Sequence, residues 1–265
     1  MKLLLVADLH YTLPQLDWVL KVAAEYDLVV ISGDLLELSS MVDPEAQIVV
    51  VLAYLKRIRA RTRLIVCSGN HDLDVIGANG ERQAGWLSAL ADLDVPADGE
   101  TITIGDADFT LCPWWDGPLT LAEIGAQIEA ARTQRRGRQW IWVNHAPPSG
   151  SQTSWNGSRS YGDRELAEWV ERFAPQMVLS GHVHEAPFSR NGSWVDRIGE
   201  TWLFNAGRQI GPTPCTVAID LVAGEAAWFS LEGAETVRLD KPLVRPLDML
   251  TAMPAWMAPR LPAGA

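Results

Sequence analysis

Cysteine is scarce in this chain of 265 residues, which contains only Cys67, Cys112 and Cys215. Three widely separated cysteines are too few for a disulfide framework or a cysteine-rich zinc site. Cys67 and Cys112 lie in apolar runs typical of strands, where a free thiol behaves as a small buried hydrophobic group. The sequence therefore predicts free thiols and a reducing compartment.

Long apolar runs are also missing. The apolar start at Met1–Ala7 is ended by Asp8 and His10 before it reaches the length of a signal-peptide core. The apolar stretch Ile48–Leu55 is far too short to cross a bilayer. We therefore expect a soluble cytoplasmic protein that does not act in a membrane.

Basic residues are outnumbered by acidic ones, with 22 Lys and Arg against 33 Asp and Glu and a net charge of −11. Proteins that clamp long nucleic acids neutralise phosphates with clustered Lys and Arg. The composition therefore argues against a long nucleic acid as partner, although a local basic pocket fits it. Hydrophobic residues make up 48% of the chain, which is enough for a sizeable core.

The N-terminal quarter alternates short apolar runs with amphipathic segments. We expect strands at Lys2–Ala7, Leu28–Ser32 and Leu64–Cys67, and helices at Pro14–Glu25 and Pro44–Ala60. A β-α-β-α-β order implies a parallel sheet with right-handed crossovers.

The remainder of the chain is richer in strands. Before His184 we expect helices at Arg82–Leu90, Leu119–Thr133 and Asp163–Phe173, a hairpin of Thr101–Ile104 with Phe109–Pro113, and strands at Trp140–Val143 and Met177–Leu179. After His184 we expect short antiparallel strands at Trp194–Ile198, Thr201–Phe204, Thr216–Leu221 and Ala226–Leu231. The predicted fold is α/β, a sandwich of two mixed β-sheets flanked by helices.

The composition changes near residue 233, after which prolines are frequent. We therefore predict a main folded domain over residues 1–232 and a Pro-rich C-terminal extension over residues 233–265. Within the extension, Leu247–Met257 could form a short amphipathic helix that packs on the domain or on a second subunit of a homo-oligomer. A partly ordered tail is the alternative.

Polar motifs follow five of the apolar segments. They are Asp8-Leu9-His10, Gly33-Asp34, Gly69-Asn70-His71-Asp72, Asn144-His145 and Gly181-His182-Val183-His184. All five histidines of the chain fall within these motifs. Because ligands bind at the carboxyl ends of strands in open α/β sheets, we expect the motifs to meet at one edge.

The residue types in these motifs predict a metal centre. Seven side chains offer oxygen or imidazole nitrogen, namely Asp8, His10, Asp34, Asn70, His145, His182 and His184. This donor set suits two divalent cations that share a bridging carboxylate, with Mn²⁺ preferred and Fe, Zn, Co or Ni as alternatives.

The order and spacing of the five motifs resemble the calcineurin-like metallophosphoesterases, over roughly residues 1–205. The resemblance implies two sets of metal ligands that share Asp34 as the bridge. The first set is Asp8, His10, Asp34 and His184, and the second is Asp34, Asn70, His145 and His182. It also implies a phosphoric ester hydrolase in which a metal-bridging hydroxide attacks phosphorus.

Two further residues of the third motif are candidates for catalysis. His71 stands next to Asn70 and could protonate the leaving group or donate a hydrogen bond to it. Asp72 could orient His71, or it could fix the local turn.

Loop residues supply candidates for substrate binding. Trp115 and Tyr161 could stack on a nucleobase, whereas an aromatic ring that anchors its own loop is the structural alternative. Arg159 and Arg208 could each bind a phosphate oxygen, or each could pair with one of the many acidic residues.

The preferred function is hydrolysis of a small phosphomonoester or phosphodiester. The first alternative is the activity of the class III cyclic-nucleotide phosphodiesterases, which share these motifs. A nuclease is disfavoured by the acidity of the chain. A catalytically silent interaction module is disfavoured by the complete ligand set and by His71.

Overall fold

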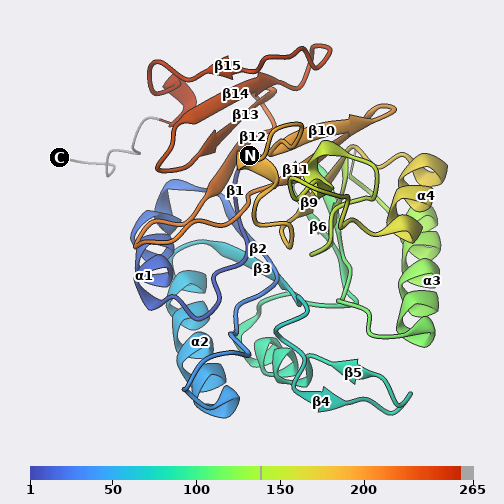
Figure 1. Ribbon diagram of the computed structural model, residues 1–265. Coiled ribbons are helices and arrows are strands. Elements are labelled where there is room, and N and C mark those ends of the chain that lie inside the picture. Colours follow the sequence, from blue (N-terminus) through green and yellow to red (C-terminus); the bar gives the residue numbers. More distant parts are fainter. Residues whose placement is uncertain (138, 258–265) are drawn as a thin grey trace.

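The computed structural model describes residues 1–137 and 139–257, and Figure 1 shows two β-sheets packed together with helices on both outer sides. One sheet contains β1 (Lys2–Val6), β2 (Leu28–Ser32), β3 (Arg63–Cys67), β12 (Thr216–Asp220), β13 (Glu225–Phe229), β14 (Ala234–Arg238) and β15 (Asp248–Met249). The other contains β6 (Thr101–Ile104), β7 (Ala107–Leu111), β8 (Gln139–Val143), β9 (Met177–Ser180), β10 (Val195–Ile198) and β11 (Thr201–Asn205).

The strand order explains how both sheets come to be mixed. The seven-stranded sheet has the order β15-β14-β13-β12-β1-β2-β3, and the six-stranded sheet has the order β10-β11-β9-β8-β7-β6. Strands β1, β2 and β3 are parallel, as are β7, β8, β9 and β11. The predicted two-sheet α/β fold is confirmed. Strand β11 departs from the expected antiparallel half, because it pairs in parallel with β9.

Alternation along the strands divides the core into layers. In β1, Leu3 and Leu5 face the space between the sheets, whereas Leu4 and Val6 face the opposite side. All four side chains are fully buried. A strand buried on both faces has no polar face, which is why β1 reads as a continuous apolar run.

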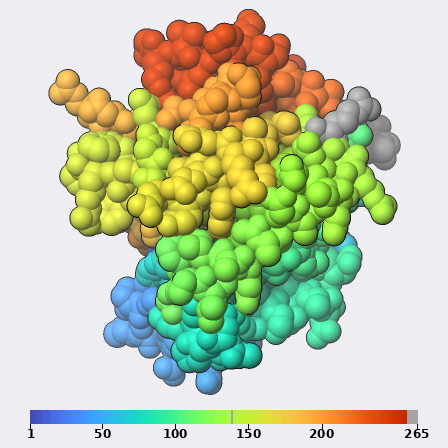
Figure 2. Space-filling model, turned by 90° about the vertical axis from the view of Figure 1, so that its right-hand side faces the viewer, coloured from blue at the N-terminus to red at the C-terminus, as the bar shows by residue number. Residues whose placement is uncertain are grey.

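Helices cover the outer faces of the two sheets. Helices α1 (Leu13–Val22) and α2 (Pro44–Arg59) pack on the seven-stranded sheet, and α3 (Pro118–Gln134) and α4 (Arg164–Phe173) pack on the six-stranded sheet. The green and yellow surfaces of α3 and α4 face the viewer in Figure 2. Asp163 caps α4 as predicted, because its Oδ1 accepts a hydrogen bond from the Leu166 backbone N–H at 2.8 Å.

The predicted helix at Arg82–Leu90 is confirmed only from Gly85 onward, and there as a 3₁₀ helix. Arg82–Gln83 form strand β5, which pairs with β4 (Val75–Ile76) in a separate two-stranded sheet. A 3₁₀ helix then runs over Gly85–Leu93. Gly85 packs so closely on Val75 that a Cβ there would lie 2.6 Å from the Val75 side chain. The tertiary contact at this glycine therefore overrides the local helical pattern.

The segment after residue 233 continues the seven-stranded sheet, because β14 pairs with β13 and β15 pairs with β14. The predicted boundary between residues 232 and 233 falls in the turn between β13 and β14. The proposed amphipathic helix at Leu247–Met257 is wrong, since Asp248–Met249 is a strand and Ala255–Met257 is a single 3₁₀ turn. Residues 258–265 of the predicted extension lie outside the described residues.

Two expectations from composition concern the cysteines and segments that could span a membrane. Cys67, Cys112 and Cys215 are buried free thiols, as predicted for the first two. No helix in residues 1–137 and 139–257 is both long and apolar enough to cross a membrane. Short 3₁₀ helices at Ala23–Glu25, Gln152–Ser154 and Ala186–Phe188 complete the structure.

Candidate metal centre

The five polar motifs meet at the carboxyl ends of strands from both sheets. Asp8 follows β1, Asp34 follows β2 and Asn70 follows β3, all in the seven-stranded sheet. His145 and His182 follow β8 and β9 in the six-stranded sheet. The carboxyl ends of parallel strands from both sheets therefore face one site, as the sequence predicted.

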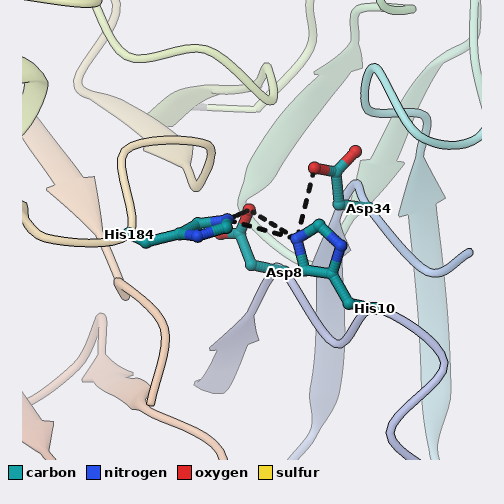
Figure 3. Close-up of side chains that lie close together, drawn as sticks. All are labelled: Asp8, His10, Asp34 and His184. Carbon is teal, nitrogen blue, oxygen red and sulfur yellow. Dashed lines mark hydrogen bonds and ion pairs between the residues drawn. The ribbon is translucent and has the colours of Figure 1, made fainter. Parts of the chain in front are cut away.

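Four of the predicted ligands form a tight group, shown in Figure 3, in which Asp8, His10, Asp34 and His184 point toward one another. One donor atom from each lies within 4.8 Å of the others. The Nε2 atoms of His10 and His184 are 3.1 Å apart, and His184 Nε2 is 3.1 Å from Asp8 Oδ1. These residues are the predicted first set of ligands.

The second predicted set lies on the other side of Asp34. His145 Nε2 is 3.2 Å from Asp34 Oδ2, and His182 Nδ1 is 2.9 Å from Asn70 Oδ1. The rings of His145 and His182 are 5.2 Å apart between centroids. Asp34 Oδ2 also lies 3.5 Å from His10 Nε2. One carboxylate oxygen thus stands between the two sets, where a bridging ligand is required.

The hydrogen bonds of His145 leave one atom ready for a cation. Its Nδ1 lies 2.6 Å from the Ser32 carbonyl oxygen, so Nδ1–H donates and Nε2 is bare in the neutral ring. The buried Nε2 has no hydrogen-bond partner, yet it faces the carboxylates of Asp34 and Asp8. A bare nitrogen and two carboxylates repel one another unless a positive charge stands between them. The residues therefore fit divalent cations.

The pKa values of the histidines reflect a balance between burial and the nearby carboxylates. Burial alone would lower the pKa of His145, but Asp34 and Asp8 raise it to about 10. Burial lowers the pKa of His10 to about 4 although Asp34 and Asp8 oppose this shift. Burial and the charge on His145 lower the pKa of His182 to about 4. In the metal-free centre, His10 and His182 are therefore neutral, which is the form that binds metals, whereas His145 holds a proton that it must release before its Nε2 can bind a cation.

Backbone strain is concentrated at this centre. Asp8, His10, Asp34 and His182 all have positive φ, between 42° and 69°. Non-glycine residues rarely adopt this region, and each such residue costs about 1–3 kcal/mol. The surrounding fold therefore holds four of the seven predicted ligands in conformations that they would not choose alone.

The glycines of the motifs are required by close approach. A Cβ at Gly69 would overlap Asp34 Oδ1, and a Cβ at Gly181 would lie 2.5 Å from Asp8 Oδ2. A Cβ at Gly33 would overlap His145 Nδ1, and the φ of +86° at this glycine is also unfavourable for other residues. Side chains at these positions would displace the predicted ligands.

His71 lies beside the first ligand group, with its ring 4.5 Å from that of His10. Its backbone N–H donates to Asp34 Oδ1 at 2.9 Å. Its Nδ1 is 3.4 Å from Glu37 Oε1, and the second oxygen of Glu37 is 3.3 Å from His10 Nδ1. Sequence reasoning missed Glu37. The signal that could have found it is an acidic residue three positions after Asp34 in the same loop.

Asp72 does not contact the ring of His71. Its buried carboxylate accepts hydrogen bonds from four backbone N–H groups, those of Asp34, Leu35, Leu36 and Gly69, at 2.8–2.9 Å. Burial and the nearby charge of Asp34 raise the pKa of Asp72 to about 7. Of the two roles that the sequence left open, this geometry fits the structural one, since Asp72 ties the loop after β2 to the loop after β3.

Replacing Asp72 should therefore reduce stability strongly. Asp72→Ala leaves four buried N–H groups without an acceptor, and unsatisfied buried groups cost about 1–3 kcal/mol each. We expect a loss of about 3 kcal/mol or more in the free energy of unfolding, measured by denaturant titration. Asp92→Ala, at an exposed position, serves as the control. Equal stability of the two variants would contradict the structural role.

Of two adjacent tryptophans, the one that the sequence did not select lies at the centre. The ring of Trp114 is 5.0 Å from that of His182 and 5.6 Å from that of His145. The Trp114 backbone N–H donates to Ser68 Oγ at 2.9 Å. Trp115 instead donates from Nε1 to Asp163 Oδ2 at 2.6 Å. Trp115 thus has the anchoring contact that was the structural alternative to stacking.

The remaining substrate-binding candidates differ in their surroundings. Arg159 stacks on the Tyr161 ring, with its guanidinium carbon 4.2 Å from the centroid, and it also donates to the Tyr161 hydroxyl. These two side chains pair with each other within one loop. The charge of Arg208, in contrast, acts on His10, and its backbone N–H donates to the His184 carbonyl at 3.2 Å. Arg208 is therefore the candidate that lies beside the predicted metal ligands.

Comparison with known sequences agrees with this geometry. A family model described as calcineurin-like phosphoesterase matches residues 1–186. This range contains all seven predicted ligands and His71. A search of curated proteins found no match.

Several solved structures share the fold. A protein of Thermus thermophilus is 15% identical, with a TM-score of 0.58, covering 90% of this chain and 98% of that one. A dimetal phosphatase from Danio rerio is 11% identical, with a TM-score of 0.58 and coverage of 90% and 99%. A purple acid phosphatase from yellow lupin (Lupinus luteus) seeds is 15% identical, with a TM-score of 0.54, and the match covers 92% of this chain but 52% of that one.

Proposed function

The chain belongs to the calcineurin-like phosphoesterase family and is a metal-dependent phosphoric ester hydrolase, and on this premise we propose that it hydrolyses a small phosphomonoester or phosphodiester at a binuclear centre. The observation that carries the proposal is the position of Asp34 Oδ2, within 3.5 Å of both His10 and His145. A single carboxylate between two groups of nitrogen and oxygen donors suits two cations that share it.

The chain's own residues would hold the cations in two sets. Asp8, His10 and His184 would bind one, Asn70, His145 and His182 the other, and Asp34 both. Two bound divalent cations supply Lewis-acid polarisation of the phosphoryl oxygens and lower the pKa of water. Manganese is the metal that we propose.

His71 is proposed as the group that assists departure of the alcohol. Its Nδ1 faces Glu37 at 3.4 Å, which leaves Nε2 available for the oxygen of the leaving group. The backbone N–H of His71 donates to Asp34 Oδ1, so the backbone that carries the ring is tied to the proposed bridging carboxylate. Glu37 is therefore proposed as a positioning residue for His71.

Arg208 is proposed as a ligand of a non-bridging phosphate oxygen, because its charge acts on His10 and its backbone is held on His184. Trp114 forms another wall of the centre, against His145 and His182. A flat apolar ring beside the centre excludes water from one side of the bound phosphoryl group.

A comparison of aryl phosphomonoester and aryl phosphodiester substrates tests the proposed function. The protein purified with Mn²⁺ is expected to hydrolyse at least one of the two classes above the rate in buffer, and the ratio of their kcat/KM values assigns the preference. Cyclic nucleotides are measured in parallel, because a higher kcat/KM on them would favour the cyclic-nucleotide alternative. Metal bound without turnover on any ester would favour a silent interaction module and overturn the proposal.

A further inference from the structure

A cavity of about 580 Å³ opens beside His71. It is lined by His71 and Glu37, by the start of α2 and by the segment Leu73–Val75. The cavity is large enough for a small organic molecule. It adjoins the ring that we assign to the leaving group, and it contains none of the seven predicted metal ligands.

Part of the wall of this cavity is apolar and uncovered. Leu38 is 52% exposed and Val75 is 43% exposed, although both line the cavity. Ile48 and Leu73 add apolar surface between them. Large apolar side chains that line a hollow beside a catalytic group are typical of binding sites for organic molecules.

The charges around the cavity are mostly negative. Glu37, Asp43, Glu45 and Asp74 line it, against one basic residue, Arg82. One guanidinium nitrogen of Arg82 donates to the Leu73 carbonyl at 2.8 Å, so this single basic side chain is held against the wall of the cavity and is outnumbered by four carboxylates. Acidic side chains at the start of α2 also offset the attraction that a helix N-terminus exerts on anions. An anionic group would therefore be repelled here.

We propose that this cavity binds the leaving alcohol of the substrate and selects an organic alcohol that is uncharged or cationic. The inference rests on the proposed function. In the reaction, the bond from phosphorus to the alcohol oxygen breaks, its electron pair stays on that oxygen, and His71 supplies the proton. Attacking water provides the new oxygen on phosphorus and loses one proton to the solvent, which balances the proton that His71 gives to the alcohol. The alcohol therefore departs on the side of His71, which is where the cavity lies.

This selection disfavours substrates whose leaving group carries further phosphates or a carboxylate. It disfavours the interior phosphates of a nucleic acid, because the leaving group there is itself a polyanion. It favours esters of simple apolar alcohols and of amino alcohols, whose ammonium group is attracted by the acidic rim.

Three aryl esters with the same phosphoryl part test the proposal. Their leaving phenols carry a trimethylammonium, a nitro or a carboxylate substituent, placed so that the phenols have similar acidity. We expect kcat/KM to decrease in the order ammonium, neutral, carboxylate. We expect Glu45→Lys to reduce the ratio of ammonium to carboxylate ester by about fivefold or more, since it reverses one charge of the rim. High salt should reduce the same ratio.

Glu45 is a suitable position because its side chain is exposed at the start of α2 and lines the cavity. Glu171→Lys makes the same change in net charge on exposed surface of α4 and should leave the ratio unchanged. Equal kcat/KM on the three esters, or equal effects of the two variants, would overturn the leaving-group assignment while leaving the proposed function intact. Absence of hydrolysis of all three esters would instead overturn the proposed function.

Discussion

Chelation of divalent cations from the purified protein is expected to abolish phosphoester hydrolysis, and Mn²⁺ is expected to restore it at least partly. The reason lies in the electrostatics of the centre. Asp8 and Asp34 are buried and face His145 Nε2, which lacks a hydrogen-bond partner, so the site is built for positive charge. Without the cations, the developing charge on the phosphoryl oxygens loses the Lewis-acid stabilisation that two divalent ions would supply.

Asp34→Asn tests the same dependence on metal by mutation, because it keeps the shape of the side chain but removes its charge. An outer-sphere partner of a metal is worth about 10–100-fold in affinity, and a shared ligand should exceed this, so we expect more than about 100-fold weaker binding. Metal analysis and the shift of the unfolding midpoint on Mn²⁺ addition measure this directly. Free Mn²⁺ at about 100 times its Kd stabilises the folded chain by about 2.7 kcal/mol. A chelated protein with its full rate would contradict the metal-dependent mechanism.

His71→Ala is expected to retain metal and to lose turnover. General acid catalysis contributes about 10²–10⁴-fold, so we expect a loss of this size on esters of poorly acidic alcohols. On esters of very acidic phenols the loss should be smaller, because such leaving groups depart without a proton. The measurement is a plot of log kcat/KM against the pKa of the leaving group, for the wild type and the variant.

Glu37→Gln provides the companion to this experiment. It preserves the size of the side chain that faces His71 Nδ1 at 3.4 Å and removes the negative charge. We expect a weaker loss with the same dependence on the leaving group, because Glu37 acts through His71.

Equal losses on all leaving groups in His71→Ala would remove the general acid from the mechanism and leave at most a hydrogen-bond donor.

Much of the fold could be predicted because the strands that carry the site are short apolar runs ended by polar motifs. β1, β2 and β3 are buried on both faces, and this leaves a signal that survives without any knowledge of the partners. The segment Arg82–Leu90 was predicted only in part, for the opposite reason. Its structure depends on pairing with β4 and on contact of Gly85 with Val75, and neither is encoded locally.

The candidate site shows the same division. The candidate metal ligands could be selected from residue type and position after a strand, and the structure brings them together. The choice between Trp114 and Trp115 could not, because neighbouring residues point to opposite sides and only the tertiary structure shows which side faces His182. Glu37 was missed because an acidic residue in a loop is ordinary in a chain of net charge −11.

The junction of the two sheets at the candidate centre has a mechanical consequence. The ring of His145, carried by one sheet, lies 2.6 Å from the carbonyl of Ser32 and 3.2 Å from Asp34, both carried by the other. Cations bound there would cross-link the two sheets through their ligands. Metal binding should therefore slow hydrogen exchange of the amides in β2 and β8 together. Removal of the metals should speed exchange in both strands, one from each sheet.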